Sequence, residues 1–527
     1  MIDSLIEVLD RYAHALSAEP VPGQDQDLLH IAGQLPQYSS GEVVELFSRL
    51  AIYANASAGA SVDSQAANQW PQAMAMLFCA IPGQQIPVWL PVSALPDVAD
   101  LYQKSPDESS LRNLLLSFMI CHDSEQGLDM WFQLICTDPP NTSQNIQLAF
   151  SPLTKARSAQ LTDDMMVALV ASAPANVPVA TAIYELANHQ FRKEVVSEHP
   201  LENRAENLTD LLGTLVGRLA QVEEGNLPND GSPEAIAQTI QDSVSLIIAI
   251  MDALSLIKHE PAVGKFNQAL ELRHRRIQVE AATALARMDD EAGKKTLVSL
   301  AQHPVVRPRV IAYAEELGIE SEISLEHQGP IAVAESELAL WLSQPDQMGF
   351  APTEMELVVQ RELYWPSYEE PLTCFLFSYE YGSGEQAFRN VGISGPLTHA
   401  FTADLCSLST ADQFSAFAGW QTVSDEIYMV AIGRAEELLA GETDRLRRRM
   451  AESPVDEPVE RVLASFFGEF VLVVSGIRDG KPGTMIVQLD QNDWIEQGNP
   501  QSPVEWHLAL DIWKGRKLLT NFNPAFS

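Results

Sequence analysis

The chain has 527 residues, which is too many for one core of ordinary size, so two or more domains are expected. Its 33 basic and 71 acidic side chains give a formal net charge of −38, and acidic residues outnumber basic ones on both sides of Pro330. A field of this sign repels phosphate backbones and anionic lipids. We therefore expect no nucleic-acid partner and no membrane partner.

The compartment follows from signals that the sequence lacks. Residues 1–10 carry acidic side chains where a signal peptide has a basic region. No stretch of uncharged apolar residues reaches the length of about 18 that is needed to cross a bilayer. The five cysteines are widely spaced and form no C-x-x-C pair, so neither a disulfide framework nor a structural zinc site is expected. These features predict a cytoplasmic protein without a cofactor.

The first 320 residues have the apolar spacing of successive helices. This spacing is found over residues 5–16, 41–54, 110–121, 163–173, 207–222 and 233–257. Proline and glycine interrupt it near residues 81–95 and 200–232, where breaks in the helical region are expected. We interpret residues 1–320 as antiparallel helix pairs, each of which buries an apolar stripe against the next.

One segment of this region is repeated. Residues 275–288 form an apolar helical face, residues 294–302 a short second helix, and residues 306–318 begin the pattern again. Three positions of the first copy recur 32 residues later: Arg275 as Arg307, Ala282 as Ala314, and Leu285 as Leu317. A period of this length with two helices in each unit is typical of a solenoid.

Residues 271–318 resemble HEAT repeats, in particular the short HEAT-like form found in phycobilin lyases. The resemblance implies an α-solenoid, with packing between helices at residues 281, 282 and 285 and at the matching residues 313, 314 and 317. Pro308 departs from the pattern and is expected in the first turn of its helix, where proline is tolerated. The resemblance implies nothing about chromophore attachment.

Residues 321–345 are predicted to connect the helical region to a second domain at 346–527. Strands are expected at residues 373–379, 389–394, 426–432, 469–475, 484–489 and 504–512, and helices at 397–407, 412–420, 435–450 and 459–467. Residues 478–483 are predicted to be a hairpin loop. Paired strands mixed with helices favour an α+β domain with a mostly antiparallel sheet.

A glycine-containing turn in this second domain is a candidate ligand site. If a helix opens at Pro396, its free backbone N–H groups attract anions, and nearby polar side chains would assist. The residues of this candidate are Gly392, Ser394, Gly395, Thr398 and His399. The alternative is a tight turn that needs glycine and places proline at the first helical position.

A second candidate lies in the predicted strand 504–512, whose alternation puts Glu505, His507 and Asp511 on one face. Glu505 and His507 are weak candidates for metal ligation or acid–base chemistry. Metal sites usually need three protein ligands, and the sequence offers no dense cluster, so no metal site is expected. The ordinary alternative is a strand with one face in water.

A third candidate is a row of arginines along the repeat surface: Arg275, Arg276, Arg307 and Arg309. Such a row would bind an acidic peptide of a partner protein. In a chain this acidic, pairing of the same arginines with internal carboxylates is the favoured alternative.

The leading hypothesis is a non-enzymatic protein–protein interaction or scaffold protein that uses a HEAT-like helical surface to bind an unidentified protein. The competing hypothesis is an enzyme, or a protein that binds a small ligand or anion, with its site in the α+β domain. A third is a structural component that assembles with itself. The sequence leaves the oligomeric state open.

Overall fold

A computed structural model describes residues 33–58, 69–79, 81, 83–107, 109–141, 146–155, 160–173, 176–226, 232–382, 387–422, 428–496 and 504–523. The chain divides into two compact units, unit 1 over residues 1–297 and unit 2 over residues 298–527. A helical region is followed along the chain by two antiparallel sheets with helices, which confirms the predicted fold class. The helix predicted at residues 5–16 lies outside the described residues.

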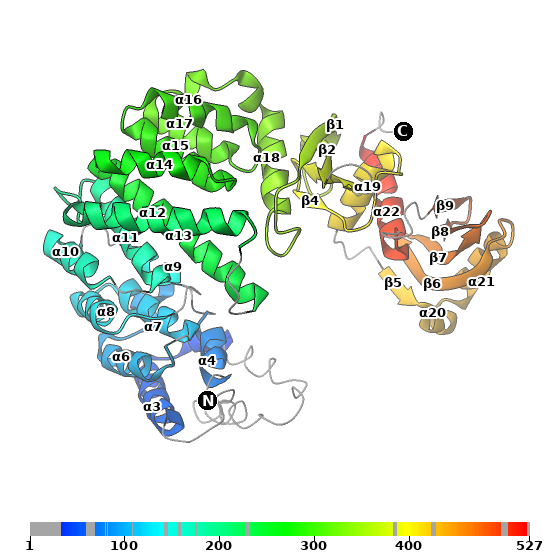
Figure 1. The fold of residues 1–527 in the computed structure, drawn as a ribbon. Helices are drawn as coiled ribbons and strands as arrows, with labels where there is room; N and C mark the ends of the chain where they lie inside the picture. Colours follow the sequence, from blue (N-terminus) through cyan, green and yellow to red (C-terminus); the bar gives the residue numbers. More distant parts are fainter. Residues whose placement is uncertain are drawn as a thin grey trace. The chain divides into compact units, whose positions relative to one another are not determined.

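Unit 1 is helical throughout its described part. Its α-helices are α3 (Ser40–Ala58), α4 (Gln69–Cys79), α5 (Ile86–Trp89), α6 (Leu95–Lys104), α7 (Ser110–Cys121), α8 (Glu125–Thr137), α9 (Ile146–Phe150), α10 (Asp163–Ser172), α11 (Val177–Arg192), α12 (Ala205–Glu223), α13 (Pro233–Ile257), α14 (Val263–Leu270), α15 (Arg275–Arg287) and the start of α16 (Glu291–Ser299). Helices near one another in sequence pack together, as α11 does on α13 and α13 on α15 (Figure 1). The five predicted helices that fall on described residues are confirmed as α3, α7, α10, α12 and α13.

Side-chain caps fix where several of these helices begin. Ser124 accepts a hydrogen bond from Gly127 N, Thr162 from Met165 N, and Asn176 from Val179 N. Each cap satisfies one of the free N–H groups that every helix start exposes. In the repeat, Asp290 does the same for α16 by accepting from Gly293 N at 2.8 Å, as its sequence position predicts.

Among the described residues, α13 is the one helix long and apolar enough to cross a membrane by length and composition. Half of that stretch is buried inside unit 1, and its apolar residues belong to the continuous core that joins α3 to α15. The helix also carries Asp252, whose carboxylate is bound by side chains of α11 and α15. These contacts are those of a helix that belongs to the core of unit 1.

Unit 2 contains α17 (Arg307–Leu317), α18 (Pro330–Leu342), β1 (Glu354–Tyr364), β2 (Pro371–Tyr381), β3 (Phe388–Ser394), β4 (His399–Ala400), α19 (Thr410–Gln421), β5 (Tyr428–Ala431), α20 (Ile432–Leu438), α21 (Ala440–Met450), β6 (Asp456–Phe466), β7 (Glu469–Arg478), β8 (Lys481–Val487), β9 (Asn492–Glu496) and α22 (Trp506–Phe522). The first sheet has the strand order β1-β2-β3-β4 and the second the order β5-β6-β7-β8-β9. Pro308 lies in the first turn of α17, as predicted, and Gly318 ends that helix at φ +68°. The predicted hairpin loop is confirmed as the short turn between β7 and β8.

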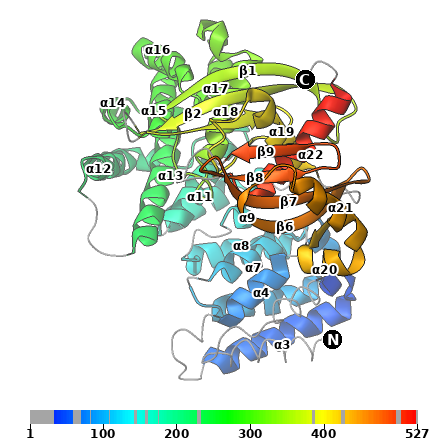
Figure 2. The same cartoon turned by 90° about the vertical axis from the view of Figure 1, so that its right-hand side faces the viewer.

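The two sheets of unit 2 enclose a pair of helices. Helices α19 and α22 cross in the middle layer and share one apolar core with the inner faces of both sheets (Figures 1 and 2). Helix α18 covers the outer face of the first sheet, and α20 with α21 covers the outer face of the second. Because both faces of both sheets are covered, their central strands are apolar on both sides.

That layering explains two wrong predictions. Residues 459–467 were expected as a helix and form part of β6, whose Val462 faces the middle layer while Leu463 faces the outer one. Residues 504–512 were expected as a strand and form most of the first half of α22, which is buried nearly all round. A short element buried on both sides carries no polar stripe, so its period cannot be recognised from sequence.

The helix predicted over residues 397–407 is also wrong. This segment forms the short strand β4 and a loop that is held by one buried side chain. The Asn390 amide donates to the carbonyls of Phe401 and Ala403, both at 2.9 Å, and its oxygen accepts from Leu405 N at 3.0 Å. These hydrogen bonds replace the ones that a helix would make.

Candidate functional site

A hollow of unit 1 lies over helix α11 and has a volume of about 640 Å³. We call it the α11 groove. One wall is α9 with the turn at residues 151–154, and the other is the part of α13 around residues 242–245. The groove is partly open to solvent and is not an enclosed cavity.

The floor of the groove follows from the spacing of residues in α11. Its floor residues are Pro178, Thr181, Ala182, Glu185 and Leu186. Successive steps of three and one place them on a single stripe of the helix, which extends over roughly 12 Å at 1.5 Å per residue. Two of the five, Thr181 and Ala182, have small side chains.

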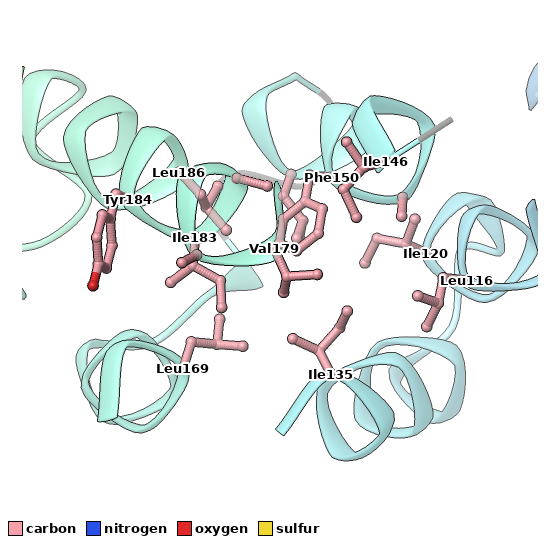
Figure 3. Close-up of a cluster of buried hydrophobic side chains, with 14 of the residues drawn as sticks. Leu116, Ile120, Ile135, Ile146, Phe150, Leu169, Val179, Ile183, Tyr184 and Leu186 are labelled. Atoms are coloured by element: carbon pink, nitrogen blue, oxygen red, sulfur yellow. The ribbon is translucent and has the colours of Figure 1, made fainter. Parts of the chain in front are cut away.

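The wall formed by α9 is firmly attached. Ile146 and Phe150 point into the buried cluster that joins α7, α8, α10 and α11 (Figure 3). The Trp131 indole N–H donates to the carbonyl of Ala149 at 2.9 Å. On the solvent side of α9, Leu148 stays 45% exposed and lines the groove, which gives the groove an apolar edge that nothing in the described chain covers.

Two carboxylates give the groove a negative charge. Asp242 lies on the α13 wall and accepts a hydrogen bond from Gln238 at 2.8 Å. Glu185 lies on the floor, where solvent reaches it but surrounding protein atoms displace much of its hydration. That desolvation raises the pKa of Glu185, an effect that the positive charge of Arg276 opposes and the negative charge of Asp252 reinforces.

A polar network behind the floor holds α11 to its neighbours. The Asp252 carboxylate of α13 accepts from Asn188 at 2.9 Å and from Arg287 at 2.8 Å, and it also pairs with Arg192. His199 shares a 3.1 Å hydrogen bond with the Asn188 side chain, and burial lowers the pKa of His199 to about 4, so the ring is neutral at neutral pH. The network gives the groove a rigid base.

The structure places the first sequence-predicted site on strand β3 and the turn after it. Ser394 is fully buried and donates to Glu337 of α18 at 2.8 Å. Gly392 lies directly under Leu338, and Gly395 adopts φ +115° against the backbone of Thr373, so both glycines are required by packing. No helix begins directly after Gly395, since the next element is β4. The turn therefore has no free N–H groups of a helix start to attract an anion.

The remaining residues of that candidate belong to an aromatic cluster. The His399 ring stacks on Trp420 with 4.0 Å between ring centroids and lies edge-on to Phe401 at 4.9 Å. Burial lowers the pKa of His399 to about 4, so it acts as a neutral aromatic ring. Thr398 is half-buried beside it. Ser394 and His399 thus have separate packing partners.

The second candidate, Glu505 with His507, lies at the start of α22 and not on a strand. The two side chains are exposed, and His507 Nδ1 lies 3.3 Å from a carboxylate oxygen of Glu505. Asp511 is one helical turn further on and pairs with Lys514 at 2.6 Å. Over the described residues, no group of three His, Cys, Asp or Glu side chains is arranged to hold a metal ion.

The four arginines of the third candidate have different environments. Arg275 is exposed and donates to Gln278 at 2.8 Å, Arg276 lies near Glu185, and Arg309 is half-buried on α17. Arg307 is only 3% exposed and is bound by Glu335 and by backbone carbonyls of unit 2. The prediction that Arg307 is a partner-binding surface residue is wrong.

Sequence reasoning missed the α11 groove. Asn176 as an N-cap and the apolar spacing after it were available signals for α11. No local pattern indicated that α9 and α13 would flank this helix.

Compared with family models, with curated proteins and with solved structures, the chain has no match.

Proposed function

We propose that this chain is a non-enzymatic, cytoplasmic interaction protein that binds a segment of a partner protein in the α11 groove of a HEAT-like helical surface. The observation that carries the proposal is the groove itself. It is an open hollow over small side chains, with an uncovered apolar edge at Leu148 and two carboxylates beside it.

The groove specifies the chemistry of the bound segment. A stripe of roughly 12 Å accepts about two turns of a helix, a common mode in which an amphipathic helix lays its apolar face into a groove. Apolar side chains of the segment would contact Leu148, the exposed apolar residue at the edge of the groove. A lysine or arginine beside them would approach Glu185 and Asp242, a pairing that the net charge of −38 favours at long range.

The test is a selection of a random 12-residue peptide library on the full-length protein, followed by affinity measurement with the enriched peptides. We expect enriched sequences with two or three apolar residues at helical spacing and at least one basic residue. They should compete with one another for one site. Enrichment of acidic peptides, of none at all, or of peptides that bind a groove-filled Ala182→Leu variant equally well would overturn the proposal.

The charge of the groove gives a first prediction. We expect the double variant Glu185→Gln, Asp242→Asn to bind a selected basic peptide about tenfold more weakly, which corresponds to about 1.4 kcal/mol for two partly exposed charges. Fluorescence anisotropy of the labelled peptide measures the change. Glu206→Gln is the matched control, because it removes one exposed carboxylate of unit 1 on α12, outside the groove. A loss of affinity in the control equal to that in the double variant would show that only overall charge matters.

The raised pKa of Glu185 gives a second prediction. An acid whose pKa is raised becomes protonated at a higher pH than an ordinary glutamate, so its negative charge is lost earlier as the pH falls. We expect peptide affinity to fall as the pH is lowered, beginning at a higher pH than an ordinary glutamate would cause, and Glu185→Gln to flatten that dependence. Asp242, Asp252 and Arg276 are the charged groups nearest this site, and they are retained in both proteins. An equally steep dependence in the variant would contradict the assignment.

A further inference from the structure

The two sheets of unit 2 have the same register. In the first sheet, Leu376 of β2 pairs with Ile393 of β3. In the second, Val473 of β7 pairs with Ile486 of β8. The neighbouring pairs Phe375–Ser394 and Leu472–Val487 match in the same way, so β2 corresponds to β7 and β3 to β8 without a shift.

An irregularity occurs at the same place in both sheets. In β1 the pairing passes from Leu357–Phe377 to Val359–Leu376, which leaves Val358 as an extra residue. In β6 the pairing passes from Glu460–Val474 to Val462–Val473, which leaves Arg461 as an extra residue. With β2 matched to β7, these two bulges coincide, whereas a second register shift of β6, between Asp456 and Val459, has no counterpart in β1. A bulge is a specific feature of a fold, so its recurrence at one register position is unlikely to arise twice independently.

The middle helices contact each other reciprocally. A side chain on Gly419 of α19 would overlap the carbonyl oxygen of Asp511, and a side chain on Gly515 of α22 would overlap the carbonyl oxygen of Ser415. In each helix the glycine follows the other contact residue by four positions. Each helix thus contributes the same two positions to the crossing, a glycine and the residue four positions before it. Such a reciprocal contact is the signature of a two-fold axis through the crossing.

We infer that unit 2 is an internal pair of related modules, residues 330–421 and 440–522, each a helix, four strands and a helix. The inner face of each module therefore has as its partner a module of the same kind, as in a two-fold symmetric dimer joined into one chain. Both modules place one helix on the outer face of their sheet and the other in the shared middle layer.

The correspondence between the modules matches His399 and Trp420 of the first module with Asp493 and Arg516 of the second. His399 pairs with Ile393 in the first sheet, as Asp493 pairs with Ile486 in the second. Trp420 directly follows Gly419 of α19, as Arg516 directly follows Gly515 of α22. Both sets of equivalent residues touch. The ring of His399 stacks on Trp420, and Asp493 lies 3.6 Å from Arg516. One position pair thus holds an aromatic stack in one module and an ion pair in the other.

This equivalence is testable by exchange in the full-length protein. We expect His399→Asp and Trp420→Arg, made singly, each to lower the urea midpoint followed by far-UV circular dichroism. We expect the double variant to regain part of that loss, because the new pair occupies the geometry of Asp493 and Arg516. The matched control is His399→Asp with Phe401→Arg, since Phe401 also touches His399 but corresponds to Ile495 rather than to an arginine.

The outcomes separate clearly. Recovery in the exchanged pair and none in the control supports the internal pair of modules. A double variant that loses the sum of the two single losses, or that gains no more than the control, overturns it. If His399→Asp alone does not fold, a folded double variant still supports the inference and an unfolded one overturns it. Peptide binding in unit 1 plays no part in this result.

Discussion

Replacing Gly515 with alanine is expected to lower the free energy of unfolding of unit 2 by about 3 kcal/mol. The added methyl group would overlap the carbonyl oxygen of Ser415, a backbone atom that cannot rotate away, so α19 and α22 must move apart. These two helices fill the space between both sheets, and their separation opens the shared core. Urea unfolding followed by circular dichroism measures the change.

Gly433→Ala is the control for this prediction. Gly433 also lies in a helix of unit 2, α20, but a methyl group there meets nothing within 4 Å. Because alanine is the better helix former, we expect this variant to be neutral or more stable by up to about 1 kcal/mol. A Gly515→Ala protein as stable as Gly433→Ala would show that the two middle helices are not packed as closely as described.

Replacing Arg307 with alanine is expected to destabilise unit 2 by about 4 kcal/mol, the range found when one partner of a buried ion pair is removed. The guanidinium of Arg307 donates to the carbonyls of Ala301 and Ala332 and to Glu335, each at 2.8 Å. Removing it leaves a largely buried carboxylate and two carbonyls without their donor. The same urea measurement, with the free energy extrapolated to water, gives the size of the effect.

Arg275→Ala is the matched control, because Arg275 is the repeat-equivalent of Arg307 but is exposed on α15. We expect a change within about 0.5 kcal/mol, as for most surface substitutions. The contrast also decides between the two uses proposed for these arginines. If Arg307→Ala left stability unchanged, the side chain would be free for a partner and its structural role would be refuted.

The helical half of the chain was predictable because its elements are amphipathic. Ala205–Glu223 buries one face and exposes the other, so its period is visible in the sequence. The caps at Asp290 and Gly318 were predictable because each depends on the residue type at a single position beside a helix. In unit 2 the hairpin at Asp479 and Gly480 could be found, since both residues adopt the positive φ that such turns require.

Two of the failures in unit 2 have one physical origin. Helix α22 is buried on nearly every side, and the second half of strand β6 is buried on both faces, so neither stretch retains the polar stripe from which a period is recognised. The internal pair of modules was equally invisible, because it is preserved in register and in the bulges at Val358 and Arg461 rather than in residue identity. Features of this kind appear only when strands are paired.

The candidate site escaped prediction for another reason. Its floor is a stripe of α11 that any amphipathic helix could have, and it becomes a groove only because α9 and α13 rise on either side. The residues that the sequence made prominent have structural roles. His399 is an aromatic packing residue, and Arg307 is a buried anchor. Polar residues that stand out in a sequence, such as these two, can serve packing and buried ion pairing rather than ligand binding or catalysis.

Hydrogen–deuterium exchange of the full-length protein, with and without a peptide selected for binding, tests the central claim most directly. Binding in the α11 groove predicts slower exchange at residues 146–154 and 178–186 and around residue 242, and unchanged exchange on α19 and α22. Protection confined to unit 2, or to faces of unit 1 away from these residues, would contradict the proposed function.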